Sequence, residues 1–198
     1  MKEIEIKIKI DDRAGLIKRI EMLGGKKILG DEGLVSDIMY NNLSGDFDVG
    51  NKKGRHLRLR KAPFGNRLTY KEKLDGKKHA YLLKRTEIET AVEDVEKTDL
   101  ILIKLGFVHY LVREKLILDY SLDGFRLEFH TLPFLGEFLE IEAEEKELTR
   151  ILQKLGLEIT QGINKGYHQL FSEYCKKHGW QPETPLTFEQ EQISKQTN

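Results

Sequence analysis

Glutamates recur in pairs at two-residue spacing along this sequence. The pairs are Glu3 and Glu5, Glu87 and Glu89, and Glu140 and Glu142. Residues two apart on an extended strand point to the same side and lie about 7 Å apart, so each pair directs two carboxylates into one space. Carboxylate oxygens suit hard divalent cations such as Mg²⁺, which needs few protein ligands and keeps several waters. These glutamates are therefore candidate metal ligands, although salt bridges would explain Glu87 and Glu89 equally well.

Lysines and arginines occupy the same alternating segments. They are Lys7, Arg58, Arg60, Lys71, Arg85, Arg113 and Lys115. A guanidinium group binds phosphate through two parallel hydrogen bonds, so several basic side chains around one space suit a polyanion. Carboxylates and basic groups that share one cavity indicate a metal–polyphosphate ligand. The alternative is that these charges only pair with one another.

The elements that position these residues are mostly strands. Alternation of apolar and charged residues predicts eight strands, at 1–10, 34–41, 55–61, 67–73, 84–92, 108–119, 125–131 and 137–144. Apolar residues at helical spacing predict four helices, at 12–23, 94–105, 146–155 and 167–177. The first three helices end in Leu-Gly, and glycine readily takes the left-handed conformation that follows a helix.

Two arrangements of these elements remain open. In an open antiparallel sheet the charged face would simply be exposed to water. A sheet of eight strands tends to close, however, and helices packed outside it by their apolar stripes turn the charged face inward. An inward ionic face is costly unless the interior is wet and holds ions. We therefore expect an α+β fold, a closed antiparallel eight-stranded β-barrel around a charged tunnel, with the helices packed outside.

Length and composition indicate the number of domains, the classes of partner and the cellular compartment. The 198 residues suit one domain, expected at 1–180, followed by a polar tail at 181–198 that is poorly ordered or lies on the surface. Lys and Arg equal Asp and Glu at 33 each, which argues against a nucleic-acid or membrane-surface binder. With one cysteine, Cys175, no internal disulfide can form, which suits the cytoplasm. We expect no signal peptide and no membrane-spanning segment.

Several segments, in order, resemble the CYTH family, also called the triphosphate tunnel metalloenzymes. They are Glu3–Lys7 (ExExK), Leu57–Arg60, Leu68–Lys71, Arg85–Glu89 (RxExE), Leu102–Phe107, Gly136–Glu142 (GxFxEIE) and Lys165–Tyr167. The resemblance extends from residue 1 to about residue 174 and is nearest to the CyaB-like branch. The family contains class IV adenylyl cyclases, thiamine triphosphatases and tripolyphosphatases.

The resemblance implies roles for the glutamates, lysines and arginines of these strands. Glu3, Glu5 and Lys7 are expected to be catalytic, and Lys165 joins the seven basic residues above in binding a small-molecule triphosphate. The implied cofactor is Mg²⁺ or Mn²⁺, with ligands expected among Glu3, Glu5, Glu128, Glu140 and Glu142, and further candidates Glu87, Glu89 and His130. One metal ion would clamp the triphosphate, and a second would activate a water or a ribose hydroxyl. A homodimer is also compatible with the resemblance.

Two positions depart from the family pattern. The basic pair of the sixth strand, usually K-x-R, is reversed as Arg113 and Lys115. Family members usually carry an aspartate where this sequence has His130, although Glu128, two residues earlier on the same face, could supply the missing carboxylate. His130 could instead bind a softer metal such as Mn²⁺ or serve as a proton donor.

Three functions follow from these patterns. We expect hydrolysis of inorganic triphosphate, thiamine triphosphate or a nucleoside triphosphate, because hydrolysis needs only the triphosphate site. The alternative is a class IV adenylyl cyclase that converts ATP to cyclic AMP and pyrophosphate. That reaction also requires a pocket for the base, and no residues of the sequence identify one. A further alternative, kept open by His130, is a non-catalytic polyphosphate-binding or nucleotide-binding protein.

Overall fold

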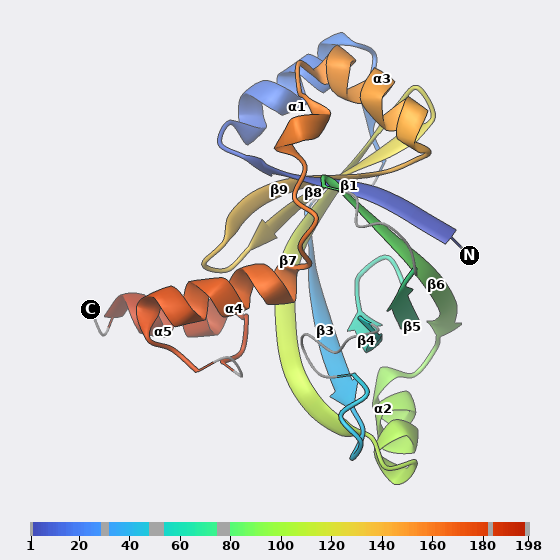
Figure 1. The fold of residues 1–198 in the computed structure, drawn as a ribbon, viewed down its shortest axis with the longest axis vertical. Coiled ribbons are helices and arrows are strands. Elements are labelled where there is room, and N and C mark those ends of the chain that lie inside the picture. Colours follow the sequence, from blue (N-terminus) through green and yellow to red (C-terminus); the bar gives the residue numbers. More distant parts are fainter. Residues whose placement is uncertain (1, 29–31, 48–53, 75–79, 182–183, 197–198) are drawn as a thin grey trace.

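Eight antiparallel strands close into a barrel in the computed structural model of the chain (Figure 1). They are β1 (Lys2–Ile10), β3 (Gly33–Asn41), β4 (His56–Lys61), β5 (Asn66–Lys73), β6 (Leu82–Val92), β7 (Val108–Leu122), β8 (Phe125–Leu132) and β9 (Gly136–Glu142). Their order is β7-β3-β4-β5-β6-β1-β9-β8, and the pairing of β8 with β7 completes the circle. This confirms the expected barrel and excludes the open sheet. The structure describes residues 2–28, 32–47, 54–74, 80–181 and 184–196.

The helices lie where helical periodicity placed them, with two short additions. They are α1 (Arg13–Met22), α2 (Val95–Lys104), α3 (Glu145–Leu155), α4 (Tyr167–His178), the 3₁₀ turn η1 (Ile159–Gln161) and α5 (Phe188–Gln196). Gly24, Gly106 and Gly156 all have positive φ, as expected after a helix. The unpredicted strand β2 (Lys26–Lys27) pairs with β7 and is too short to show any periodicity.

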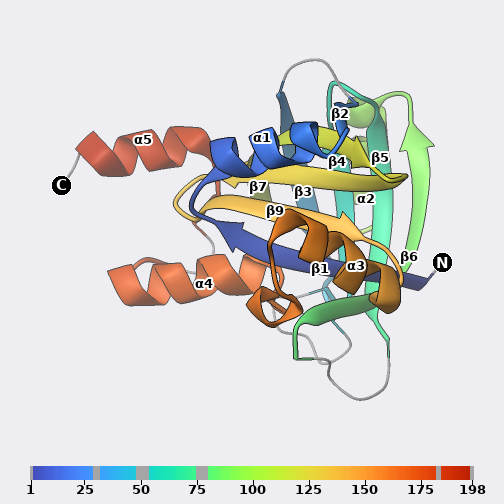
Figure 2. The same cartoon turned by 90° about the horizontal axis from the view of Figure 1, so that it is seen from above.

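The main apolar core lies outside the barrel wall, beneath α1 and α3 (Figures 1 and 2). Ile6 and Ile8 of β1 are fully buried there together with Ile20 of α1 and Leu148 of α3. Because side chains alternate along a strand, Lys7 between the two isoleucines points to the opposite face. Packing of the helices on the outside therefore directs the charged side chains into the lumen.

The C-terminal tail completes part of the barrel wall. β8 pairs with β7 only from Leu116 onward, so the preceding residues of β7 lack a β8 neighbour. There Leu186 donates its N–H to the carbonyl of Val112 and accepts a hydrogen bond from the N–H of Glu114. The Leu186 side chain is only 1% exposed. Leu186 is thus held against β7, and the helix α5 follows it; the polar sequence of α5 did not predict a helix.

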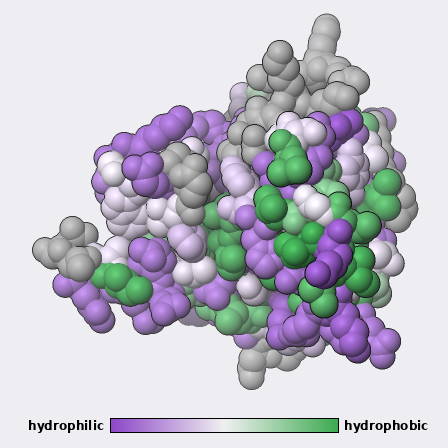
Figure 3. Space-filling model, turned by 90° about the horizontal axis from the view of Figure 1, so that it is seen from below, coloured by the Kyte–Doolittle hydropathy of each residue, from purple (hydrophilic) through white to green (hydrophobic). Residues whose placement is uncertain are grey.

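Helix α2 covers a smaller core at the opposite end of the molecule from α1 and α3. Val95 and Leu102 pack against Tyr40 and Leu59. The face on which α2 lies shows hydrophobic residues beside hydrophilic ones (Figure 3). Leu105, which caps the C-terminal end of α2, is exposed. Within the described part of the chain, none of the helices has the length and apolar character needed to cross a bilayer.

Candidate active site

The barrel encloses two adjoining cavities. The larger has a volume of about 590 Å³ and the smaller about 100 Å³. Both are lined by Glu5, Arg58, Lys71, Lys115 and Glu140. The alternation of the strands puts these side chains on the face opposite to the apolar core, as the sequence predicted.

Charge is distributed unevenly between the two cavities. The smaller one is lined by two glutamates but by seven basic residues, which are Lys7, Arg58, Lys71, Lys73, Arg85, Arg113 and Lys115. In the larger cavity six glutamates face six lysines and arginines. Tyr167 and His168 of α4 also line the smaller cavity, so this helix is not wholly outside the barrel. The smaller cavity is therefore the part of the lumen that attracts a polyanion.

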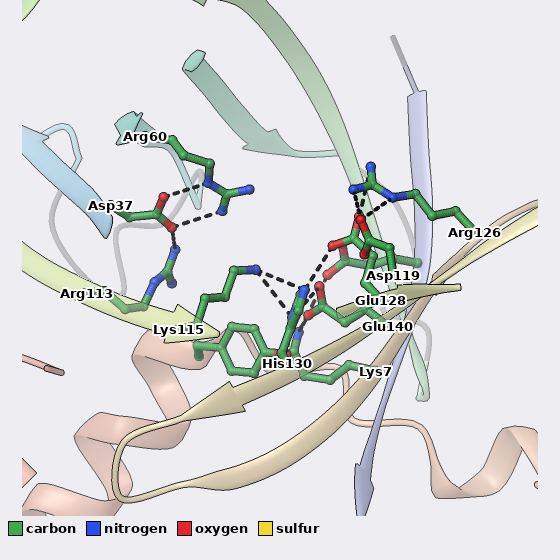
Figure 4. A network of polar contacts seen from close by, with 12 residues as sticks. Lys7, Asp37, Arg60, Arg113, Lys115, Asp119, Arg126, Glu128, His130 and Glu140 are labelled. Carbon is green, nitrogen blue, oxygen red and sulfur yellow. Dashed lines mark hydrogen bonds and ion pairs between the residues drawn. The ribbon is translucent and has the colours of Figure 1, made fainter. Parts of the chain in front are cut away.

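Glu128, His130 and Glu140 form a group in which one ligand atom from each lies within 4.8 Å of the others. Glu128 and His130 are two residues apart on β8, and β9 places Glu140 directly opposite Glu128. His130 lies 2.9 Å from Glu128 and 3.3 Å from Glu140. Figure 4 shows the three side chains converging, with Lys115 beside them. Two carboxylates and an imidazole can together hold a divalent metal ion.

The three groups have the protonation states that metal ligands require. Burial raises the pKa of Glu128, but the hydrogen bond with His130 and the charge of Lys115 lower it to about 2. Burial also opposes ionisation of Glu140, yet Lys7, with Nζ 2.7 Å away, holds the pKa of that carboxyl well below its usual range. Burial and Lys115 lower the pKa of His130, so its ring is neutral at pH 7.

Neighbouring residues also fit a bound cation. The hydroxyl of Tyr167 is hydrogen-bonded to Nδ1 of His130 at 2.9 Å, which orients the ring and leaves Nε2 on the side of Glu128. Asp119, the register partner of Glu128 on β7, is fully buried; its Oδ2 accepts hydrogen bonds from Arg126, but its Oδ1 has no hydrogen-bond partner. A buried carboxylate oxygen without a partner is costly, and a cation nearby would stabilise it.

Most of the predicted site residues come together in the lumen. Of the predicted phosphate-binding residues, the smaller cavity is lined by Lys7, Arg58, Lys71, Arg85, Arg113 and Lys115, and the larger also by Arg60. Of the predicted metal ligands, the larger cavity is lined by Glu5, Glu87, Glu89, Glu128, Glu140 and Glu142. Glu3 lies opposite Arg85 in the register of β1 and β6, but its side chain falls outside the described part of the structure.

Lys165 does not join the other basic residues. Its side chain is 46% exposed, and its Nζ lies 2.7 Å from a carboxylate oxygen of Glu173 on α4. It lines neither cavity. The segment before α4 directs this lysine along the outside of the helix, so the geometry does not support the expected phosphate contact.

Glu87 and Glu89 are engaged in ion pairs. Glu87 lies 2.8 Å from Lys71, and Glu89 lies 3.1 Å from Arg67. Neither belongs to the metal-capable group, and nor does Glu142, which faces Glu5 across β1 and β9. Of the two interpretations of Glu87 and Glu89, the geometry agrees with the salt bridges.

Sequence reasoning missed two buried aspartates and two histidines. Asp37 and Asp119 are fully buried at inward positions of β3 and β7. Aspartate is depleted inside strands, so an aspartate within an apolar strand was an available signal. His56 and His168 stack with ring centroids 5.7 Å apart at the smaller cavity. They come from distant segments, and no local pattern predicts that contact.

Comparison with known proteins agrees with this geometry. The CYTH domain family matches residues 1–167. A protein of Methanocaldococcus jannaschii, provisionally named an adenylate cyclase, is 32% identical over 168 residues, covering 83% of this chain and 90% of that protein. The structure of the PH1819 protein from Pyrococcus horikoshii has 28% identity and a TM-score of 0.67, covering 87% of this chain and 99% of that one.

A more distant structure shares the fold. A Hippeastrum protein, provisionally named an adenylyl cyclase and described as having a dominant triphosphatase activity, gives a TM-score of 0.62 at 16% identity. The match covers 90% of this chain and 97% of that one. Because the family match spans most of the sequence and the closed barrel agrees with it, the chain belongs to the CYTH domain family.

Proposed function

We propose that this protein is a divalent-metal-dependent triphosphatase acting on inorganic triphosphate, thiamine triphosphate or a nucleoside triphosphate. The observation that carries the proposal is the metal-capable group Glu128, His130 and Glu140 next to a cavity lined by seven basic side chains. A ligand that satisfies both must combine several negative charges with a divalent cation. A triphosphate with Mg²⁺ or Mn²⁺ has this chemistry.

The basic residues of the lumen are assigned to the phosphates, and the glutamates are assigned to the metal. Arg58, Arg113 and Lys71 would bind phosphate oxygens and neutralise the charge that develops on the leaving phosphate. Lys7 keeps Glu140 ionised and fixed by its ion pair. Glu5, which lines both cavities, is assigned as a further metal ligand. A metal bound by these carboxylates supplies Lewis acidity and lowers the pKa of a water.

Cyclisation of ATP is the second candidate. The larger cavity, about 590 Å³, extends beyond the basic one and offers room for more than a phosphate chain. The relative from Methanocaldococcus jannaschii is also provisionally named an adenylate cyclase. Since the charged lining of this cavity offers little to recognise a base, we rank hydrolysis first.

One incubation series separates the two reactions. The protein is incubated with Mg²⁺ or Mn²⁺ and, separately, with tripolyphosphate, thiamine triphosphate and ATP, while orthophosphate, pyrophosphate and cyclic AMP are measured. Orthophosphate without cyclic AMP supports the triphosphatase and ranks its substrates. Cyclic AMP with equal pyrophosphate makes the protein a cyclase, and no turnover of any substrate leaves a binding protein.

A matched pair of variants tests the metal site. Glu140→Gln keeps the shape of the side chain but removes a charged ligand, so metal-dependent turnover should be lost. Glu147→Gln alters an exposed glutamate of α3 that pairs with Arg150, and it should retain full activity. Equal activity of both variants would contradict the assignment of Glu140 to the metal site.

A further inference from the structure

A buried carboxylate lies among the arginines of the lumen. Asp37 of β3 is fully buried. Arg60 donates hydrogen bonds from Nε to Oδ1 at 2.7 Å and from Nη2 to Oδ2 at 3.0 Å, and Nη2 of Arg113 donates to Oδ2 at 2.8 Å. Nη1 of Arg58 lies 3.6 Å from the same Oδ2. Three guanidinium groups therefore surround one carboxylate (Figure 4 shows two of them).

Strand register alone places Asp37 at this point. β3 pairs with β4 on one side and with β7 on the other. Asp37 is directly opposite Arg60 on β4 and directly opposite Arg113 on β7. A carboxylate on the middle strand can thus hold arginines from both neighbours, and its two oxygens suit the planar guanidinium fork.

The arginines retain unused donors after binding Asp37. Nε of Arg58 and Nε of Arg113 are buried and have no hydrogen-bond partner. Both residues line the smaller cavity. Buried donors without partners are uncommon in proteins, and an anion in this cavity would satisfy them. Asp37 therefore binds N–H groups of Arg60 and the Nη2 group of Arg113, while the Nε–H groups of Arg58 and Arg113 remain available to an anion in the cavity.

Asp37 also offsets repulsion between the three like charges. Burial, and then the charge of Arg60, lower the pKa of Arg58 to about 10, whereas the charge of Asp37 opposes both effects. The arginines together hold the pKa of Asp37 well below its usual range against burial, so the carboxylate stays ionised at neutral pH. The array is consequently held in place before any anion enters, as preorganised charge stabilisation requires.

We propose that Asp37 is a positioning residue of the phosphate site. It keeps its bonds to Arg60 while a triphosphate is bound, and it leaves the Nε–H groups of Arg58 and Arg113 for phosphate oxygens. The inference rests on the proposed function for the identity of the anion. It does not require that the anion be hydrolysed.

The first test uses the unaltered protein. Arginine Nε–H resonances are followed by NMR during a titration with tripolyphosphate in the presence of a chelator, and they are assigned with Arg→Lys variants. The signals of Arg58 and Arg113 should shift on binding, whereas the Nε–H of Arg60 should stay in place. If the Arg60 signal moves as far as the others, Asp37 is displaced by the anion and the proposal is wrong.

The second test compares Asp37→Asn with a matched control, Asp123→Asn. Asp123 lies in the turn between β7 and β8, where it pairs with Lys154 of α3 and lines neither cavity. Its backbone has a positive φ, which asparagine tolerates. Asp37→Asn should lower kcat by about 10- to 100-fold, as misplaced groups do. KM should stay equal or fall, because a competitor for the arginines is lost. The control should match the unaltered protein.

Thermal melting keeps the test independent of catalysis. Tripolyphosphate without metal should raise the Tm of Asp37→Asn more than that of the unaltered protein, because the anion replaces the missing charge. An equal Tm rise, or an unchanged kcat, overturns the positioning role. If the unaltered protein binds tripolyphosphate but does not hydrolyse it, the proposed function fails, while the NMR and melting results still decide the role of Asp37. If the variant does not fold, the NMR titration decides alone.

Discussion

Nε2 of His130 lies 2.9 Å from a carboxylate oxygen of Glu128, two residues earlier on the same strand. The family resemblance leads one to expect an aspartate at position 130, and here a neutral imidazole lies beside two carboxylates instead. Burial lowers the pKa of His130, and Lys115 in its charged form, with Nζ 3.1 Å from Nε2, lowers it further; burial also lowers the pKa of Lys115 itself, to about 7. One nitrogen and two oxygen donors make a softer site than carboxylates alone.

The first prediction concerns metal preference. Carboxylates suit both Mg²⁺ and Mn²⁺, but Mn²⁺ is the softer ion and accepts an imidazole nitrogen more readily than Mg²⁺ does. His130→Asp should therefore lower the ratio of Mn²⁺-supported to Mg²⁺-supported turnover several-fold, measured at saturating metal. His178→Asp, at the exposed end of α4, is the matched control and should leave the ratio unchanged. An unaltered ratio in His130→Asp would show that His130 does not bind the metal.

The second prediction concerns the orientation of that imidazole. Tyr167→Phe removes the hydroxyl bonded to Nδ1 of His130 and retains the ring packed against Phe138. Loss of such an outer contact costs about 10- to 100-fold in metal affinity or activity. The Mn²⁺ concentration at half-maximal turnover should rise accordingly. Tyr174→Phe, in the apolar cluster between α4 and the β8–β9 turn, serves as control, and equal metal affinities for both variants would count against this role.

The third prediction concerns pH. Burial and the charges of Arg85 and Arg113 lower the pKa of His56 to about 3, against 6.5 in the unfolded chain. Between these values the unfolded state binds a proton that the folded state does not, so stability falls as pH falls from about 6.5 toward about 3. His56→Gln removes this contribution. The decrease in Tm between about pH 7.5 and about pH 5 should then be smaller than in the unaltered protein.

His178→Gln is the control for that measurement, because its ring is exposed on α4. It should show the same pH dependence as the unaltered protein. If the Tm of His56→Gln decreased with falling pH as steeply as that of the unaltered protein, the ring of His56 would not resist protonation in the folded state. Part of the pH dependence of Tm should remain in His56→Gln because of His168. This residue stacks on His56, and burial lowers its pKa well below the usual value.

The fourth prediction concerns the C-terminal tail. Leu186 fills an apolar cluster with Phe138 and Phe171, so Leu186→Ala should lower the free energy of unfolding by about 2–5 kcal/mol. Ile193 on α5 is half exposed, and Ile193→Ala should stay within about 0.5 kcal/mol of the unaltered protein. Urea denaturation measures both. Equal values would indicate that the tail does not pack on β7 in solution.

Several features of the site depended on pairings that no local pattern reveals. Asp37 meets Arg60 and Arg113 only because β3 lies between β4 and β7. Lys165 shared the expected role of the other basic residues, but the entry into α4 pairs it with Glu173. These outcomes depend on strand order and on the path of the chain between elements, which periodicity does not encode.

The sequence by itself determined the eight strands of the barrel, the helices α1 to α4, and the face of each barrel strand to which its charged side chains point. Alternation along a strand is a local property, so Lys7 was placed opposite to Ile6 and Ile8 without knowledge of any neighbour. Only the tertiary structure decided which inward groups meet, because closure of the barrel sets the register between distant strands. That register brings Glu128 and His130 to Glu140 and so creates the group that can hold a metal.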